Sequence, residues 1–221
     1  MSSNMYAVYL LTVCSKQYRD PVTIVIGSAK KSFVVHKELL VFYSDYFRAA
    51  FNGSFVEATE KKITLLDVKQ QVFDHFHAWL YTRKLASEDD KPLEWHHLIN
   101  LWAFGDRFQV PMLQNCVMDE LLTKERREAG YPLSLTMSAY KKTAKGSPLR
   151  KAMIGLWAYE TELDNDKGGL MTFEHDRFFT LEILADLVVE LDSARRNKVP
   201  HGKAPKRDKC FYHVHGKDEH C

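Results

Sequence analysis

The chain has 221 residues, of which 45% are hydrophobic and 12% aromatic. This much apolar side chain suffices for one sizeable core or two small ones, and it excludes disorder throughout. Lys and Arg number 31 against 29 Asp and Glu, a net charge of +2, so the overall charge requires neither nucleic acid nor an anionic membrane as partner. The apolar run Met5–Cys14 is too short to cross a bilayer, and it lacks the preceding basic stretch of a secretory signal.

The four cysteines form no recognisable disulfide framework. Cys14 and Cys116 lie in apolar contexts, whereas Cys210 and Cys221 lie at the extreme C-terminus. Small secreted domains that are stapled by disulfides carry denser and more regularly spaced cysteines. We therefore expect a reducing compartment, with a cytoplasmic or nuclear location or both.

The first part of the chain predicts a β-hairpin and two short helices. Residues 21–26 are rich in β-branched side chains, and 32–35 continue this pattern after a polar turn, which is typical of paired strands. Beyond the hairpin, apolar side chains recur at spacings of three and four, as on a buried helical face. Ser44 interrupts this run with N-cap chemistry, so we expect helices over 37–43 and 45–51.

The following segment predicts a third strand and a series of helices. Residues 63–66 form a short apolar run with Asp67 placed as an N-cap, and the helical period returns from Val68. Pro92 and Pro111 open two further helices. These elements predict an α+β fold in which a small three-stranded sheet is flanked by a helix cluster.

An all-α extension is expected after this domain. Ser147 and Pro148 suit the N-cap and first turn of one helix. Another helix is expected from about Leu181 to Arg195. Its predicted buried residues are Leu184, Leu187, Val188 and Leu191.

The last 25 residues, 197–221, carry six Lys and Arg against three Asp and Glu, with almost no aliphatic side chain. Such a segment cannot pack by itself. We therefore divide the chain into four parts. They are an N-terminal segment (1–16), the α+β domain (17–125), the helical extension (126–196) and a basic Cys/His tail (197–221).

Four ordered pieces of the sequence resemble a BTB/POZ domain. They place an Asp before the first strand, a His-Lys after the second, a Leu-x-x-x-Ser through the first helix and a Phe in the second. The pieces are residues 20–26, 33–40, 44–47 and 63–65 with Asp67, and residues 70–122 continue the match. The segment 146–150 and the Cys/His-bearing end are also similar to short single-domain BTB proteins of filamentous fungi.

The resemblance implies a non-enzymatic protein-interaction module that self-associates and, in many members, recruits a cullin-type ubiquitin ligase scaffold. Members that bind the cullin often carry a hydrophobic residue, any residue and Glu after the second helix of the pair, where this chain has Phe55-Val56-Glu57. Phe55 would fill an apolar pocket on the cullin, and Glu57 would cap a helix end or pair with a base. The alternative is that Phe55 folds back onto its own domain. No Kelch, MATH or ankyrin substrate receptor is recognisable.

The resemblance also implies structural roles for three polar residues. Asp20 is expected to accept hydrogen bonds that pin the hairpin and the start of the first helix, and His36 to cap near that helix. Ser44 is the expected N-cap of the second helix. No nucleophile is arranged with these residues, and the common hydrolase, metalloprotease and nucleotide-binding motifs are absent from the sequence. We therefore expect no enzyme activity.

The tail carries the residues with metal-ligand chemistry. Cys210, His213, His215 and Cys221, with His220 as the alternative fourth ligand, offer the thiolates and imidazoles that Zn²⁺ prefers. If zinc binds, the neighbouring cations could touch phosphate. These cations are Lys203, Lys206, Arg207 and Lys209.

Three functions remain open from the sequence. The first is a homo-oligomeric adaptor that recruits a cullin-type ligase, with self-association through Met5–Leu11 and the helix 37–43. The second is a nuclear transcription or chromatin regulator that uses the basic Cys/His tail, although we expect protein partners more than nucleic acid. The third is an oligomerisation module without a ligase partner.

Overall fold

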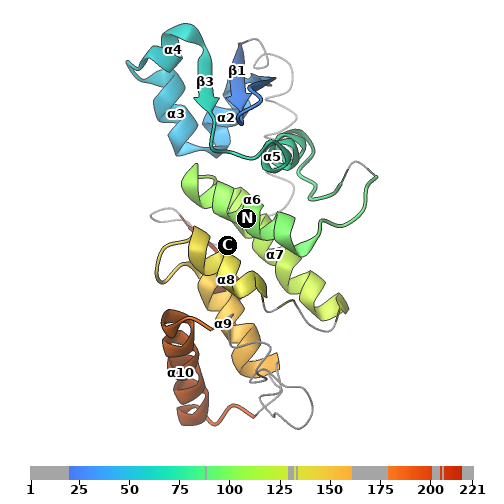
Figure 1. Cartoon of the computed structure of the whole chain (residues 1–221), viewed down its shortest axis with the longest axis vertical. Coiled ribbons are helices and arrows are strands. Elements are labelled where there is room, and N and C mark those ends of the chain that lie inside the picture. The colour runs from blue at the N-terminus through green and yellow to red at the C-terminus, as the bar shows by residue number, and fades with distance from the viewer. Residues whose placement is uncertain are drawn as a thin grey trace. The chain divides into compact units, whose positions relative to one another are not determined.

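The computed structural model describes residues 20–87, 89–128, 132, 134–160, 179–200, 205 and 207–215. The chain folds into two compact units, whose elements are labelled in Figure 1. Unit 1 holds the chain up to Ser87 together with Arg107–Val110. Unit 2 holds Glu88–Asp106 and the chain from Pro111 onward.

Unit 1 contains a three-stranded sheet of order β2-β1-β3. The central strand β1 (Pro21–Ile26) pairs antiparallel with β2 (Lys31–His36) and parallel with β3 (Lys62–Leu65). Buried and exposed residues alternate along β3, as expected for a strand with one face toward a core. The predicted hairpin and third strand are confirmed.

Four helices accompany this sheet in the described part of unit 1 (Figure 1). They are α2 (Lys37–Tyr43), α3 (Asp45–Asn52), α4 (Val56–Glu60) and α5 (Gln70–Thr82). Aromatic side chains fill the core between them. Phe47 of α3 is fully buried, and its ring stacks on Phe108 with centroids 5.7 Å apart and planes 7° from parallel. The helices predicted over 37–43 and 45–51 are confirmed, whereas α4 was not predicted.

The predicted N-cap at Asp67 is wrong. Lys69 occupies the N-cap position of α5, and no side chain caps that helix start. Asp67 instead lies in a turn closed by the Val68 N–H and the Leu65 carbonyl (3.3 Å), and its carboxylate pairs with Arg107. The carboxylate lies two residues before the N-cap position, which is too early to reach the free N–H groups of the helix.

Unit 2 is helical in its described residues. Its helices are α6 (Trp95–Arg107), α7 (Pro111–Glu128), α8 (Ser134–Lys142), α9 (Pro148–Glu160) and α10 (Leu181–Arg196), followed by the 3₁₀ turn η3 (Lys209–Tyr212). Arg107, the last residue of α6, belongs to unit 1. The helices beginning near 148 and 181 are confirmed, and α8 was not predicted. Helix α7 continues through the predicted domain boundary at residue 125. Within the described residues, no helix is both long and apolar enough to cross a bilayer.

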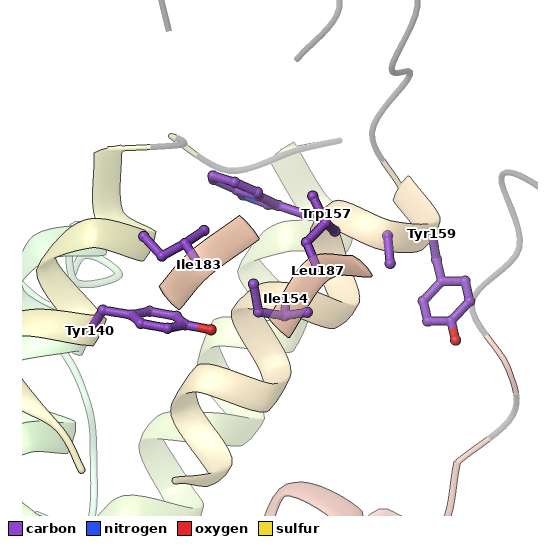
Figure 2. Close-up of a cluster of buried hydrophobic side chains, with 7 residues drawn as sticks. Tyr140, Ile154, Trp157, Tyr159, Ile183 and Leu187 are labelled. Carbon is purple, nitrogen blue, oxygen red and sulfur yellow. The ribbon is translucent and has the colours of Figure 1, made fainter. Parts of the chain in front are cut away.

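Apolar side chains hold α10 against α9 (Figure 2). Ile183 and Leu187 of α10 are buried with Ile154 and Trp157 of α9. The prediction that Val188 is buried is wrong, because this side chain is 64% exposed. It follows Leu187 by one residue, which is about a quarter turn round the helix and therefore off the packed face.

Three carboxylates spaced four residues apart on α10 add polar contacts to this packing. Each one accepts a hydrogen bond from α8 or α9. The pairs are Arg150 with Glu182 (2.6 Å), Tyr140 with Asp186 (2.7 Å) and Tyr159 with Glu190 (2.9 Å). Glu190 also pairs with Arg207 from the segment that follows α10.

The C-terminal segment around η3 packs on the helices of unit 2. The Asn115 side chain of α7 accepts from the Val214 N–H (2.7 Å) and donates to the Val214 carbonyl (2.9 Å). Tyr212 lies over Gly155, where a β-carbon would come within 2.8 Å of the Tyr212 hydroxyl. The segment lacks a core of its own, as predicted from its composition, and it is held by contacts with α7 and α9.

Candidate partner-binding site

The motif Phe55-Val56-Glu57 lies at the start of the short helix α4. Phe55 occupies the N-cap position, and its carbonyl accepts from the Ala58 N–H (3.1 Å). The preceding Gly53 ends α3 and leaves room for the Phe55 ring, because a β-carbon there would lie 3.1 Å from it. The motif therefore has a defined helical geometry, where a loop was predicted.

Two apolar side chains of this motif face solvent. Phe55 is 58% exposed and Val56 is 61% exposed, so the prediction that the Phe55 ring is largely exposed is confirmed. The alternative, in which Phe55 is buried in its own domain, does not describe this structure. Sequence reasoning missed Val56, because the family pattern leaves that position free.

Glu57 is the charged member of the motif. It lies in the first turn of α4 and is partly exposed. It makes no ion pair with any described residue. The carboxylate thus lies beside two exposed apolar side chains, which is the combination that an apolar pocket with a neighbouring cation would recognise. A contact between Glu57 and a partner protein stays a prediction.

The end of α4 is anchored to the sheet. Lys61 ends the helix in the left-handed conformation (φ 51°), and its ammonium group pairs with the Asp20 carboxylate before β1. The Asp20 carbonyl accepts from the Lys37 N–H (2.9 Å), which ties the start of β1 to the start of α2. The expected pinning of α2 is therefore present through the backbone of Asp20, and its side chain holds α4.

Asp20→Asn is expected to make unfolding less sensitive to acid. The hydrogen bond from Lys61 lowers the pKa of the Asp20 carboxyl. The stabilisation is therefore present above the unfolded-state pKa of about 4 and is lost as the pH falls through the lower folded-state pKa. Urea midpoints of wild type and variant should differ at about pH 7 and converge toward about pH 2.

The control is Asp90→Asn, which changes an exposed carboxylate that has no ion pair among the described residues. It should leave the pH dependence of the urea midpoint unchanged. A constant difference between wild type and Asp20→Asn across this pH range would contradict the assigned role of the Lys61 pair.

Ser44 has the capping role that was predicted. Its hydroxyl accepts from the Phe47 N–H (3.0 Å) at the start of α3 and donates to the Phe108 carbonyl (2.6 Å). The side chain is fully buried, and both of its bonds lie within unit 1. One hydroxyl therefore caps α3 and fixes the segment around Phe108 beside it.

The predicted capping role of His36 is wrong in its detail. His36 occupies the N-cap position of α2, but its side chain makes no capping hydrogen bond. The hydroxyl of Tyr81 on α5 accepts from the His36 N–H (3.2 Å) and shares a hydrogen bond with His36 Nδ1 (2.9 Å). Tyr81 draws the imidazole toward α5, so the residue joins β2 to that helix.

The described members of the predicted zinc set do not come together. Cys210 is disulfide-bonded, and a sulfur in a disulfide is not a thiolate ligand. His213 Nε2 lies 3.0 Å from an Asp119 carboxylate oxygen. Among the described residues, no group of three His, Cys, Asp or Glu could hold a metal ion. His220 and Cys221, the other members of the set, lie outside the described residues, so the four-ligand site stays a prediction for the chain with Cys210 reduced.

The predicted self-association surface is described in part. The segment Met5–Leu11 lies outside the described residues. In α2, the other half of this surface, Phe42 is exposed and its ring packs edge-on against Tyr43 (4.7 Å). The self-association through these segments stays a prediction.

Comparison with known proteins places this fold in a family. The family model of the BTB/POZ domain matches residues 13–125, more than half of the chain. Among solved structures, the BTB (Tramtrack and Bric a brac) domain of human gigaxonin is similar at 16% identity and a TM-score of 0.40, over 54% of this chain and 93% of that one. The BTB domain of zebrafish PATZ1 is similar at 16% identity and a TM-score of 0.38, over 56% of this chain and 97% of that one.

Among curated proteins, no relative matches the sequence. The family model covers the three strands, the helices α2 to α6 and most of α7. The chain therefore belongs to the BTB/POZ family, whose domains mediate protein–protein interaction and oligomerisation.

Proposed function

We propose that the protein is an oligomeric adaptor that recruits a cullin-type ubiquitin ligase scaffold through Phe55 and Glu57. The observation that carries this proposal is the exposure of the Phe55 ring at the start of α4. Glu57, in the first turn of the same helix, makes no ion pair with any described residue. An aromatic side chain in water contributes little to the fold, whereas aromatic anchors contribute most to interfaces. An adaptor of this kind would act in the cytoplasm or the nucleus, the location expected from the sequence.

The anchoring of α4 supports the same proposal. Gly53 ends the preceding helix α3, and the Lys61–Asp20 pair holds the end of α4 against the sheet. An anchor residue on a segment that is already ordered loses less conformational entropy on binding than one on a free loop. Val56 adds a second apolar side chain to the contact surface, so the motif offers more area than its two specified positions suggest.

The two other functions have less support. A regulator that binds nucleic acid through the tail needs free cations there, but Arg207 pairs with Glu190 and its guanidinium lies 4.1 Å from the centre of the Phe211 ring. Lys203 and Lys206 lie outside the described residues. An oligomerisation module without a ligase partner would leave the exposure of Phe55 without a function.

Phe55→Ala is expected to weaken cullin binding about thirtyfold, because emptying an aromatic anchor pocket costs about 2 kcal/mol. The melting temperature should stay nearly unchanged, since the ring is exposed. Glu57→Ala should weaken binding less, by about 1 kcal/mol, because a rim charge mainly changes the association rate. A pull-down against a panel of cullin scaffolds and a melting curve on the same proteins measure both quantities.

Leu66→Ala is the matched control, because Leu66 is an equally exposed apolar residue of unit 1 outside the motif. It should leave cullin binding unchanged. The adaptor function is rejected if the wild type binds no cullin. The assignment of Phe55 is rejected if its truncation instead destabilises the fold by about 3 kcal/mol, the cost expected for a buried aromatic side chain.

A further inference from the structure

Unit 2 contains a cavity of about 310 Å³ that is lined by α8, α9, α10, η3 and the segments that connect them. The turn between α8 and α9 contributes Lys145, and α9 contributes Lys151 and Ile154. Val189 of α10 and Phe211 of η3 complete its wall. All of these residues belong to the same unit, so the cavity is a property of unit 2 alone.

Two cations at this cavity have no ion-pair partner in the described part of the chain. Lys145 and Lys151 are both exposed, and neither makes an ion pair with any described residue. They lie six residues apart, on the turn before α9 and in its first turns. The cavity therefore offers two positive charges to an incoming group.

Part of the cavity wall is apolar and accessible. Val189 is 70% exposed, and Phe211 is 46% exposed. Ile154, which is buried, also lines the cavity and belongs to the cluster shown in Figure 2. An apolar side chain that entered the cavity would remove these surfaces from water, which is favourable in proportion to the area buried.

The other charged residues of the cavity are already paired. The Asp186 carboxylate accepts from the Tyr140 hydroxyl (2.7 Å), and Glu190 pairs with Arg207. The buried Arg150 donates to Glu182 (2.6 Å) and to the Tyr140 carbonyl (2.7 Å). Among the described residues that line the cavity, the two lysines are therefore the charges left to pair with a ligand.

We propose that this cavity binds a short acidic peptide with one large apolar side chain. The acidic residues would pair with Lys145 and Lys151, and the apolar side chain would lie against Val189 and Phe211. The apolar part of the wall favours a protein segment over a nucleic acid, because a phosphate backbone would leave Val189 and Phe211 uncovered.

The inference extends the proposed function. It rests on that function only where it identifies the bound peptide as a substrate of the ligase. The sequence carries no recognisable substrate-receptor domain, and this cavity would supply that binding surface within the chain itself. Peptide binding is nevertheless a separate property, because it is measured on the purified chain without any cullin.

The test is the binding of a fluorescein-labelled peptide, EEEFEEE, to the full chain, measured by fluorescence anisotropy at low salt. The double variant Lys145→Glu/Lys151→Glu should bind about tenfold more weakly, because each reversal removes one attraction and adds one repulsion. The matched control is Lys141→Glu/Lys142→Glu, which changes the net charge equally at two exposed lysines of α8 that do not line the cavity. The control should bind within about twofold of wild type.

A second pair of variants tests the apolar wall. Val189→Ser should weaken binding of EEEFEEE about threefold, whereas Val188→Ser, at an equally exposed neighbour outside the cavity, should not. The peptide EEEAEEE should bind more weakly than EEEFEEE for the same reason. All six altered side chains, the four lysines and the two valines, are exposed, so these proteins should fold like wild type.

Three results would overturn the inference. They are equal weakening by the two lysine double variants, equal affinity for EEEFEEE and EEEAEEE, and tighter binding of a single-stranded oligonucleotide than of EEEFEEE. Phe55→Ala should bind EEEFEEE like wild type. Loss of cullin binding with peptide binding retained, or the reverse, therefore shows which of the two proposals has failed.

Discussion

Trp157→Ala is expected to lower the free energy of unfolding by about 3–5 kcal/mol, the cost of deleting a large aromatic side chain from a core. Trp157 is fully buried between α9 and α10, and its ring packs edge-on against Phe179 with centroids 5.0 Å apart. Its Nε1 is buried and has no hydrogen-bond partner among the described residues. The loss should therefore come from the cavity and the lost apolar contacts.

Trp157→Phe tests this explanation, because it leaves a smaller cavity and retains the apolar contacts of a ring at the site. It should cost about 1.5 kcal/mol or less. Val188→Ala, on the exposed face of α10, should change stability by no more than about 0.5 kcal/mol. Urea denaturation followed by circular dichroism measures all three. A loss below about 1 kcal/mol for Trp157→Ala would contradict the packing of α10 described above.

Arg150→Met is expected to cost about 3 kcal/mol, although it replaces a buried charge by an apolar side chain of similar length. The Arg150 guanidinium donates to the Tyr140 carbonyl (2.7 Å), the Thr143 carbonyl and the Thr143 hydroxyl (3.3 Å), and it pairs with Glu182 (2.6 Å). The substitution leaves the carbonyls at the end of α8 without this donor. Their desolvation without a hydrogen bond accounts for most of the expected loss.

Arg150→Lys tests whether charge alone is sufficient. One ammonium group cannot reproduce the planar fork that reaches α8 and Glu182 together, so this variant should recover only part of the stability. Lys151→Met, at the exposed neighbour, is the control and should be nearly neutral. If Arg150→Met unfolds at the same urea concentration as wild type, the bonds at the end of α8 contribute nothing measurable.

The elements that local pattern determines were predictable, and those that depend on distant contacts were not. The hairpin, α2 and α3 follow from side-chain periodicity and from the Ser44 cap, all of which are local signals. Helix α4 has only five residues and no buried ones, so it lacks the periodicity that identifies a helix. Asp67 was assigned as a cap because its partner Arg107 lies 40 residues away.

The candidate site shows the same division. The motif at Phe55 and Glu57 could be located from the family pattern, but its exposure depends on how α3 and α4 pack. The Asn115–Val214 bonds join residues 99 apart, and no local signal indicates them. The cavity of unit 2 likewise gathers side chains from the α8–α9 turn to η3, so periodicity within one segment could not reveal it.

The carboxylates of α10 repeat every four residues, close to one helical turn, and so do its buried apolar side chains. If α10 slid along α9 by about one turn, some 5.4 Å, Asp186 would take the place of Glu182, and Glu190 that of Asp186. Leu187 and Leu191 would replace Ile183 and Leu187 in the same movement. Most contacts would therefore be made again one turn out of register.

Arg207 distinguishes these two positions of α10 along α9. After such a slide the place of Glu190 would be taken by Ala194, and the largely buried guanidinium of Arg207 would lose its carboxylate. Leaving the Arg207 charge unpaired there would cost more free energy than the other contacts gain or lose in the slide. The pairing of Arg207 with Glu190 thus selects which turn of α10 faces α8 and α9.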